Sequence, residues 1–575
     1  MKNKYSLITV LIICITVLSY RVNYFKLGSD KPYICTAWDA FGYYLYLPSV
    51  FIYHDAAELK WLPEIDKKYS VSGGQLYQAG KCPNGNYVFK YLGGVAVLQS
   101  PFFFLAHWLA GVKGYAQDGF SPPYQFAIAL SSVFYALLSL FLLRIILLRY
   151  FNDITASLTL LLLLLASNFI QYVSVDSAMS HAFLFPLYVL ILYSTLKWHE
   201  NPEIKWACLT GFVIGLATIC RPTELIIFFI PLLWNTHTKE SSKAKWKMVR
   251  ENRKHLLFAG LGGLIGVLPQ LIYWKMITGS FIYDVGSKWE FLSPHFRVLF
   301  GWEKGWFIYT PVAVLFVAGL FFIKQFPFRR SVTTFCLLNI YIIIAWHDWR
   351  YGASYSCRAL VQSYPVFALP LAALMDKINL RKWRYLFYVV CCYLIFVNLF
   401  QIAQYNSTIL HYDEMNRKYY GRIYLNPHPT PLDMSLLDTD ELLDDETNYI
   451  QKNLVTADSI LKMKLPAYGS VILSEIKLAG APHAESWIKI ETTLKIDQGT
   501  WGGFLNSELQ VGDSIKHNKV RLQNAISPLE KDNEYAFYVK VPEYFSKSDL
   551  KVSISSQSDF EGELKKLRVT YFISK

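Results

Sequence analysis

Long apolar runs recur through roughly the first 400 residues of the chain. Segments such as SLITVLIICITVLSY, LTLLLLLLASNFIQYV and YLFYVVCCYLIFVNLFQIA carry almost no charge, and their length of about 15 to 20 residues is what a helix needs to cross the hydrocarbon core of a bilayer. We therefore expect about eleven membrane-spanning helices. The predicted spans lie near residues 5–20, 123–143, 155–173, 181–196, 205–220, 222–235, 256–274, 306–323, 332–346, 359–375 and 385–404.

One apolar stretch is expected to lie on the membrane surface instead of crossing it. Residues 91–111 are rich in aromatic side chains and are interrupted by Gly93, Gly94 and Pro101, a pattern that suits an interfacial helix. With this stretch excluded, every basic loop falls on the same side of the membrane as the N-terminus. Residues 21–122 then form a first outer loop, and residues 275–305 form a second.

The hydrophobic pattern changes after Gln404. An acidic linker, DTDELLDDETNY, precedes segments such as SWIKIETTLKI, EYAFYVKV and LRVTYFIS, in which apolar and polar residues alternate. Alternation with a period of two indicates β-strands with one buried face. We expect a helical membrane domain over residues 1–404, with extracytoplasmic surface helices, and a C-terminal antiparallel β-sandwich over residues 405–575.

Composition and charge agree with a membrane protein. Hydrophobic residues make up 53% of the 575 residues and aromatic residues 17%, which does not suit a soluble protein. The net charge of +13 does not indicate a nucleic-acid partner, because the basic residues collect in short loops, as they do on the cytoplasmic side of membrane proteins. These loops contain Arg144 and Arg149, Lys197 and Lys205, Lys239 to Lys254, Lys324 to Arg330, and Lys377 to Arg384. The β domain is then extracytoplasmic.

The first outer loop contains a candidate general base. On a helix, Asp39, Tyr43 and Tyr46 would share one face, with Trp38 immediately before them. A carboxylate beside aromatic rings can take a proton from a sugar acceptor, and its pKa would rise if closure of the site removed water. The alternative is an aromatic helix at the membrane surface that Asp39 caps.

Four basic residues are expected at outer helix ends. Fixed cations at that depth would bind a lipid phosphate and stabilise it as a leaving group. The alternative is that each side chain reaches out to lipid head groups. The four residues are Lys90, Arg221, Arg350 and Arg358.

Further polar residues lie at or between the predicted spans. Charged groups near a membrane interior are costly and therefore point to a functional site, which makes Asp176, His181 and Glu224 candidates. Asp39 with Asp176 or His181 could hold a divalent metal, but lone carboxylates are weak grounds, and we expect no cofactor. In the first outer loop Cys35 and Cys82 could form a disulfide, although spacing alone does not establish one.

Residues 1–400 resemble the GT-C superfamily of integral membrane glycosyltransferases, particularly the branch of the protein O-mannosyltransferases and the lipid A aminoarabinose transferases. The resemblance rests on five motifs: Trp38-Asp39, Lys90 to Gly93, Asp176 to Met179, Arg221 to Thr223, and Arg358 beside aromatic residues. It implies that Asp39 acts as the catalytic base and that Lys90, Arg221 and Arg358 hold a polyprenyl phosphate. The family's first motif often reads Asp-Glu, whereas Ala40 follows Asp39 here, so Asp55 or Asp176 is the candidate for a second acid.

The resemblance implies an inverting transfer of one sugar. The donor would be a polyprenyl-phosphate-linked sugar in the inner (plasma) membrane, and the acceptor a hydroxyl of a protein, glycan or lipid on the outer face, where aromatic residues of the loop 275–305 could form an acceptor wall. One alternative is an oligosaccharide ligase that uses polyprenyl diphosphate. Another is a lipid or solute transporter, which predicts inverted repeats and charges near the membrane midplane, and neither is evident in the sequence.

Overall fold

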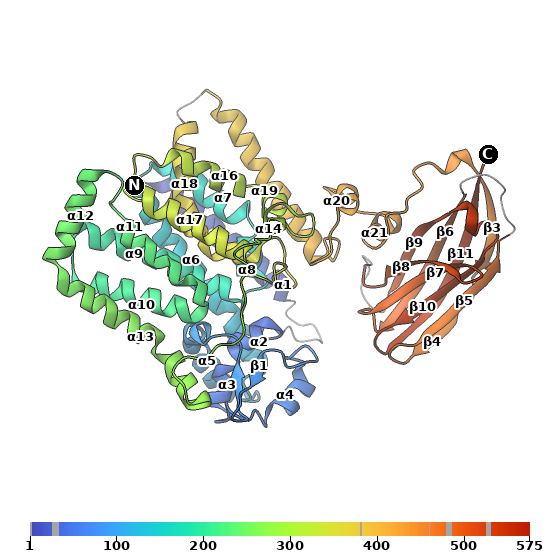
Figure 1. Ribbon diagram of the computed structural model, residues 1–575, viewed down its shortest axis with the longest axis horizontal. Helices are drawn as coiled ribbons and strands as arrows, with labels where there is room; N and C mark the ends of the chain where they lie inside the picture. The colour runs from blue at the N-terminus through green and yellow to red at the C-terminus, as the bar shows by residue number, and fades with distance from the viewer. Residues whose placement is uncertain (1–2, 26–33, 380–381, 459, 479–485, 525–530) are drawn as a thin grey trace. The chain divides into compact units, whose positions relative to one another are not determined.

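The computed structural model describes residues 3–25, 34–379, 382–458, 460–478, 486–524 and 531–575 (Figure 1). The chain forms two compact units, Met1–Leu399 and Phe400–Lys575, and each is described by itself. The sequence analysis places the domain boundary at residue 404, inside the last long helix. Of the predicted cytoplasmic loop from Lys377 to Arg384, residues 380 and 381 lie outside the described part of the chain.

The first unit is built almost entirely of helices. A short hairpin, β1 (Ala79–Lys81) and β2 (Tyr87–Phe89), is its one pair of named strands among the described residues. The α-helices are α1 (Lys4–Phe25), α2 (Asp39–Tyr44), α3 (Tyr46–Phe51), α4 (Leu62–Tyr69), α5 (Gly94–Lys113), α6 (Pro122–Leu148), α7 (Asp153–Leu165), α8 (Phe169–Ser174), α9 (Ser180–Glu200), α10 (Ile204–Cys220), α11 (Phe229–Leu233), α12 (Lys239–Glu251), α13 (Arg253–Thr278), α14 (Arg297–Phe300), α15 (Trp306–Tyr309), α16 (Ala313–Gly319), α17 (Arg329–Ile344), α18 (Tyr364–Asn379) and α19 (Arg384–Asn406). Short 3-10 helices are η1 (Pro222–Phe228), η2 (Leu320–Phe322) and η3 (Arg358–Ser363).

The long apolar runs fold as helices where the hydrophobic pattern predicts them. Within the described residues, six helical segments are long and apolar enough to cross a membrane: Lys4–Asn23, Gly94–Lys113, Pro122–Leu148, Arg253–Thr278, Arg358–Asn379 and Arg384–Asn406. Four shorter apolar helices accompany them, at Asp153–Leu165, Ile204–Cys220, Pro222–Leu233 and Ala313–Phe322. Apolar side chains remain exposed on α1, α13 and α19, as lipid-facing surfaces require. The protein is a polytopic α-helical membrane protein.

Several predicted spans are interrupted. The predicted span at 155–173 consists of α7 and α8, and the one at 222–235 of η1 and α11. The break between the predicted spans 205–220 and 222–235 follows from chemistry, because α10 ends at Cys220, Arg221 has an extended backbone, and Pro222 begins η1 without an amide hydrogen. The predicted surface segment forms α5, whose length and composition also suit a span. Its depth in the membrane therefore stays a prediction.

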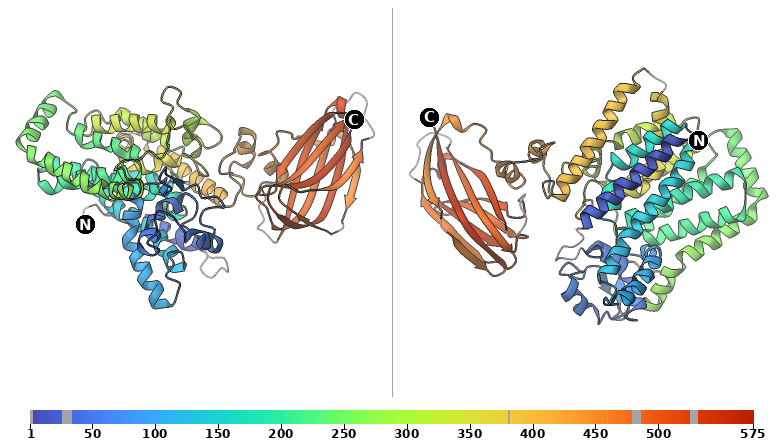
Figure 2. Two further views of the ribbon diagram at one scale, coloured as in Figure 1. Left: turned by 60° about the horizontal axis from the view of Figure 1, so that its bottom comes forward. Right: turned by 180° about the vertical axis from the view of Figure 1, so that it is seen from behind.

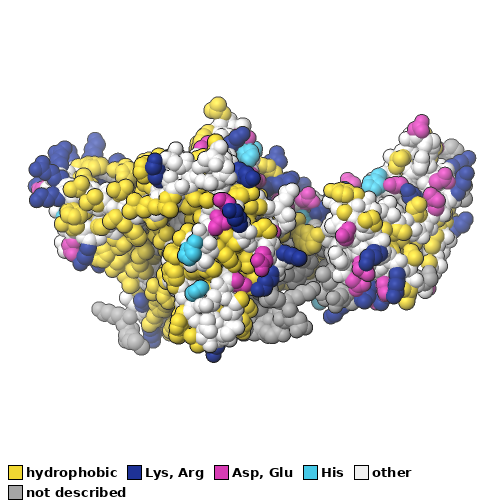
Figure 3. All heavy atoms as spheres, turned by 90° about the horizontal axis from the view of Figure 1, so that it is seen from below, with side chains coloured by type: hydrophobic (Ala, Val, Ile, Leu, Met, Phe, Trp, Pro, Cys, Tyr) yellow, Lys and Arg dark blue, Asp and Glu magenta, His cyan; other side chains and the backbone are white. Residues whose placement is uncertain are grey.

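The surface of the helical unit separates apolar from basic regions. Figure 3 shows broad apolar areas on this unit and a group of Lys and Arg side chains at the end that carries α12. Figure 2 shows α1 along the outside of the unit, where it packs against α6 and α7. Asp153 at the start of α7 accepts hydrogen bonds from the backbone of Tyr5 and Ser6, which ties the N-terminal helix to the bundle.

Helices α10 and α13 pack closely through glycines. Gly211 and Gly215 face Gly262 and Gly266, and an added Cβ at any of the four would meet backbone atoms of the other helix at less than 3 Å. Small residues four apart allow backbones to approach in this way inside membranes. This contact fixes the direction of α10, which ends immediately before Arg221.

We expect Gly211→Ala to loosen this helix pair. The new Cβ would lie 1.8 Å from the Ala259 carbonyl oxygen, and forced overpacking costs about 1–3 kcal/mol. Gly260→Ala is the matched control, because nothing lies within 4 Å of a Cβ at that position. Thermal unfolding in detergent should show a lower Tm for the first variant and an unchanged or slightly higher Tm for the second. Equal Tm values would contradict the close packing.

The C-terminal unit is an antiparallel β-sandwich, as its alternating pattern predicts. One sheet has the order β5-β10-β7-β8, and the other has the order β3-β11-β6-β9 with β4 also paired to β11. Apolar side chains from both sheets form one core, which includes Ile490, Leu505, Phe537 and Val552. The strands are β3 (Tyr449–Ala457), β4 (Leu461–Leu465), β5 (Ser470–Lys477), β6 (Ser486–Gln498), β7 (Gly503–Val511), β8 (Ser514–Arg521), β9 (Asp532–Val541), β10 (Asp549–Ser556) and β11 (Phe560–Ser574); α20 (Arg417–Ile423) and α21 (Pro431–Ser435) precede them, with 3-10 turns η4 (Glu446–Asn448) and η5 (Glu543–Phe545).

The disulfide considered for the first outer loop is not formed. Cys35 and Cys82 are both buried free thiols in one apolar cluster. The Cys35 thiol instead donates a hydrogen bond to the Gln125 backbone carbonyl, at 3.2 Å, and burial raises its pKa to about 12. Packing and hydrogen bonds, without a covalent link, hold this part of the loop.

Candidate functional site

Asp39 is the centre of a network of charged and hydroxyl groups. It begins α2, and its Oδ1 accepts hydrogen bonds from the hydroxyls of Tyr91 at 2.6 Å and Tyr77 at 2.8 Å. Its Oδ2 forms an ion pair with the Arg358 guanidinium at 2.6 Å. Both charged side chains keep some exposure, 22% for Asp39 and 13% for Arg358. Two residues that the sequence analysis selected separately thus form one pair.

The segment before Asp39 is held in an unusual conformation. Trp38 has a positive φ of 57°, which a bulky residue rarely adopts, and its amide donates to the Val71 carbonyl. The indole remains 61% exposed and lies over Gly73, where a Cβ would come within 2.4 Å of the ring. Asp39 therefore stands in the first helical turn instead of capping it, and Trp38 is the aromatic side chain beside it that faces outward.

The aromatic residues expected on one face with Asp39 gather around Tyr91. The rings of Tyr43 and Tyr91 lie 4.7 Å apart, and the Tyr46 hydroxyl donates to the Tyr91 carbonyl at 2.8 Å. Tyr43 and Tyr46 are themselves buried. Their rings thus support Tyr91 and do not form the exposed sugar platform that the sequence analysis considered.

The Asp39 carboxyl is kept ionised. Burial alone would raise its pKa, but the Arg358 charge and the hydrogen bonds from Tyr91 and Tyr77 outweigh burial and lower the pKa to about 2. The sequence analysis expected a raised pKa if closure of the site removed water, and it did not place a guanidinium beside this carboxyl. Burial and the Asp39 charge raise the pKa of both tyrosines, so these hydroxyls stay protonated donors.

Lys90 adds a second cation to the same site. Its ammonium lies 5.8 Å from the Tyr77 ring centre and 5.9 Å from that of Tyr91. It follows β2, and its amide is held by the Gln78 carbonyl. The side chain is exposed, so Lys90 presents a positive charge beside the two tyrosines that bind Asp39.

A buried lysine organises the loop that leads to Arg358. The Lys304 ammonium donates to the carbonyls of Arg350 at 2.7 Å and Gly352 at 2.6 Å. Tyr351, Gly352 and Ser356 in this loop all have positive φ, which is unfavourable for the first and the last of them. A Cβ on Gly352 would lie 3.3 Å from the Arg358 guanidinium, so the loop packs directly on the residue that pairs with Asp39.

We expect Lys304→Met to misplace Arg358. The change removes the ammonium that two partly buried carbonyls share, which costs about 1 kcal/mol or more, and should lower kcat more than it changes the KM for the donor. Thermal unfolding and steady-state kinetics measure both effects. Lys288→Met, at an exposed lysine of the same outer loop, is the control and should leave both unchanged. A Lys304→Met enzyme with wild-type kcat would show that the loop does not need its lysine.

A second polar network lies around Arg221. Glu224 accepts hydrogen bonds from the Tyr188 hydroxyl and, at 3.1 Å, from the Gln362 amide, whose oxygen pairs with His181 at 2.9 Å. Arg221 interacts electrostatically with Glu224 and His181, and also with Tyr43 beside the Asp39 site. Among the described residues, Arg221 Nη1 is buried without a hydrogen-bond partner. This unpaired cationic donor could bind an anion.

Asp176 and Arg350 are not joined to Asp39 by any hydrogen bond of the described residues. Asp176 accepts one from Gln171 at 3.3 Å, and burial raises its pKa despite the nearby Arg358 and Arg21 charges. The Arg350 guanidinium lies over the Trp349 ring at 5.2 Å. Asp55, the other candidate for a second acid, accepts from the backbone amides of Glu58 and Lys60 and so stabilises its own turn.

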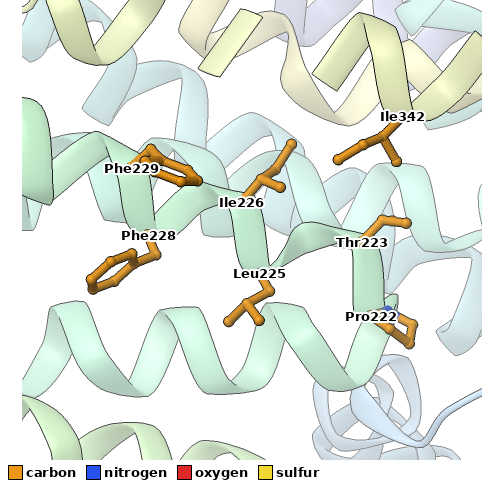
Figure 4. Close-up of a pocket in the computed structure, with 7 residues that line it drawn as sticks. All are labelled: Pro222, Thr223, Leu225, Ile226, Phe228, Phe229 and Ile342. Atoms are coloured by element: carbon orange, nitrogen blue, oxygen red, sulfur yellow. The ribbon is translucent and has the colours of Figure 1, made fainter. Parts of the chain in front are cut away.

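An apolar pocket of about 500 Å³ adjoins Arg221. Figure 4 shows Thr223 and Ile226 pointing toward Ile342 of α17, while Leu225 and Phe228 point to the opposite side of η1. Leu225 and Phe228 are about half exposed, which in a membrane helix means contact with lipid. The pocket is lined by Pro222, Thr223, Leu225, Ile226, Phe228, Phe229 and Ile342.

Sequence reasoning missed three side chains of these networks. Tyr77, Tyr188 and Gln362 bond directly to the predicted carboxylates, yet each stands in a stretch without charge or spacing that would single it out. Their roles come from contacts between segments far apart in the chain.

The chain also matches a known protein family. The family model described as dolichyl-phosphate-mannose-protein mannosyltransferase matches residues 122–274, about a quarter of the chain. The matched segment begins with α6, ends within α13, and includes Arg221 and Glu224. The chain is thus similar to this family over residues 122–274. Because the match is partial, neither the activity nor the mannosyl specificity in that description is assigned to this chain on this ground alone. No curated protein sequence matches the chain.

Solved structures of membrane glycosyltransferases resemble this chain distantly. ArnT from Cupriavidus metallidurans bound to undecaprenyl phosphate has 11% identity and a TM-score of 0.44, over 73% of this chain and 68% of that one. The archaeal oligosaccharyltransferase AglB from Archaeoglobus fulgidus has 11% identity and a TM-score of 0.43, over 77% of this chain and 61% of that one. The arabinosyltransferase EmbB from Mycobacterium smegmatis has 10% identity and a TM-score of 0.38, over 96% of this chain and 64% of that one. Because the identities and TM-scores are this low, no residue role and no substrate is assigned to this chain from these structures.

Proposed function

We propose that this protein is a GT-C glycosyltransferase that moves a single sugar from a polyprenyl monophosphate to a hydroxyl acceptor, with inversion, at the outer face of the plasma membrane. The carrying observation is the Asp39–Arg358 pair at 2.6 Å, which puts a candidate base and a phosphate-binding cation within contact distance. The description of the matched family, which names a dolichyl-phosphate-linked sugar, supports a donor of this chemical class.

The unmet Arg221 donor and the neighbouring apolar pocket suit the lipid part of such a donor. Arg221 would bind the phosphate, while Thr223, Ile226 and Ile342 would contact the first isoprene units. The exposed Leu225 and Phe228 leave the pocket open to lipid, so a long chain could enter from the bilayer. A lipid-linked donor of this kind would reach the pocket through the bilayer and would not need a water-filled path.

The reaction would use the Asp39 network as follows. The donor phosphate draws Arg358 from Asp39, and the loss of that charge raises the pKa of the carboxyl toward the range of a useful base. An acceptor hydroxyl takes the place of the half-exposed Tyr77 as hydrogen-bond donor and loses its proton to Asp39 as its oxygen attacks the anomeric carbon. The bond to the phosphate oxygen breaks, and Arg358, Lys90 and Arg221 stabilise the phosphate that leaves. One direct displacement inverts the anomeric centre.

We expect transfer from polyprenyl-monophosphate sugars by the purified protein in liposomes, without an added divalent metal. A donor panel that includes diphosphate-linked oligosaccharides, assayed with and without EDTA, tests this expectation. Transfer from the diphosphate lipids alone would indicate the ligase instead. Ile226→Trp should fill the pocket and raise the KM for a long-chain donor but not for a short-chain analogue; an equal effect on both would argue against the pocket as the lipid site.

A further inference from the structure

A second pocket, of about 490 Å³, lies within the β-sandwich unit. Its volume falls in the range of roughly 300–1,000 Å³ that small-molecule sites occupy. Helix α21 packs against β9 and closes one side, while the first residues of β9 form another. The described residues that line it are Pro429, Pro431, Met434, Ser435, Thr493, Val520, Asn524, Asp532, Asn533, Glu534, Tyr535 and Ala536.

The lining combines the two kinds of surface that a sugar ring requires. Pro429, Pro431 and Ala536 offer apolar contacts for the C–H faces of a ring, whereas Asn533 and Glu534 offer acceptors for its hydroxyls. A sugar ring likewise carries apolar C–H faces beside polar hydroxyl groups. A purely apolar ligand would leave these amide and carboxylate groups without partners, which is unfavourable.

Two asparagines of the lining have an unmet acceptor. Asn524 is 5% exposed and Asn533 is 3% exposed. The amide nitrogen of Asn533 donates to the Lys531 carbonyl at 3.0 Å, and that of Asn524 donates to the Met434 carbonyl, so both amide orientations are set. In the part of the chain that the structure describes, each Oδ1 is buried without a hydrogen-bond partner. Buried acceptors are rarely left unpaired, and a hydroxyl-bearing ligand would supply the missing donors after a small adjustment of the side chains.

The charges favour a neutral ligand. Asp532 forms an ion pair with Lys565 at 2.8 Å, which leaves Glu534 as the other carboxylate of the lining. Thr493 stands opposite Glu534 in the register of β6 and β9. An anionic sugar would place its charge beside Glu534 without a cation in the lining to balance it.

We propose that this pocket binds one or two units of a neutral oligosaccharide. This carbohydrate site belongs to the β-sandwich alone and goes beyond the transfer chemistry of the helical unit. It would allow the enzyme to bind a glycan, either the acceptor or its product, independently of the Asp39 site.

The test is direct binding to the full-length protein in nanodiscs. Saturation-transfer NMR with neutral gluco-, manno- and galacto-oligosaccharides, beside a uronic-acid oligosaccharide, should detect a neutral ligand. In the double variant Asn524→Leu/Asn533→Leu its affinity should fall about tenfold or more. Asn506→Leu is the matched control, because Asn506 is similarly buried, at 5% exposed, but lies in β7 outside the pocket; it should bind normally.

A second measurement does not depend on the variants folding. A neutral oligosaccharide with a photoreactive group should crosslink to the wild-type peptide that contains residues 532–536. Absence of neutral-sugar binding, equal affinity in the double variant, or crosslinks confined to the helical unit would each overturn the proposal. Asp39→Asn should keep this binding while it loses transfer, so the failure of one proposal is distinguishable from the failure of the other.

Discussion

Asp39→Asn is expected to reduce sugar transfer by about 10²- to 10⁴-fold, the usual contribution of a general base. The substitution keeps the shape of the side chain and its ability to accept hydrogen bonds from Tyr91 and Tyr77. It removes the negative charge and the site that would receive the acceptor proton. We expect the loss in kcat, with donor binding little weakened, because Arg221 and Lys90 remain in place.

Asp55→Asn is the matched control for Asp39→Asn. Asp55 belongs to the same outer loop, but its carboxylate accepts hydrogen bonds from the backbone amides of Glu58 and Lys60, which an asparagine oxygen can partly replace. Transfer should remain within a few-fold of wild type, as for surface changes away from a site. If Asp39→Asn transfers at the wild-type rate while it folds normally, the base lies elsewhere, and Asp176 becomes the next residue to change.

Arg358→Gln should be the second most damaging change. It removes the cation that pairs with Asp39 at 2.6 Å, and loss of one transition-state donor to a leaving anion costs about 10²- to 10³-fold in kcat. It also leaves the Asp39 charge partly buried without its partner, which destabilises the site. Transfer assays and thermal unfolding on the same preparation separate the two effects, and Arg358→Lys, which keeps the charge but not the planar guanidinium, should recover part of the activity.

The pH profile gives a sharper test of the Asp39–Arg358 pair. In the free enzyme the pKa of Asp39 is about 2, so the carboxylate is ionised throughout the assay range and does not itself set an acidic limb of kcat/KM. Without Arg358, burial is no longer outweighed to the same extent, and the pKa rises. The loss of kcat/KM at low pH should therefore begin at a higher pH in Arg358→Gln than in wild type. Coincident acidic limbs would show that Arg358 does not control the ionisation of Asp39.

The two kinds of hydrophobic pattern predicted the two architectures because each reflects local geometry. An apolar run such as YLFYVVCCYLIFVNLFQIA has no stable place in water and is long enough for a membrane helix, and this segment lies within α19. Alternation in SWIKIETTLKI requires a strand with one face in a core, and this segment is β6 of the sandwich. The positions of Asp39 and Arg358 as charged residues beside aromatic ones were also visible in the sequence.

Only the tertiary structure decided what these residues do together. Arg358 pairs with Asp39 across 319 positions of the chain, and the pattern of an apolar helix does not state which neighbour its polar end will meet. The same pairing lowers the pKa of Asp39 in the free protein, which the sequence did not indicate. The Cys35 thiol donates a hydrogen bond to the Gln125 carbonyl and forms no disulfide with Cys82. The Tyr77 hydroxyl donates a hydrogen bond to the Asp39 carboxylate. Sequence thus determined which segments are buried and in what secondary structure, whereas contacts between distant segments determined the charge, hydrogen bonding and chemistry of the site.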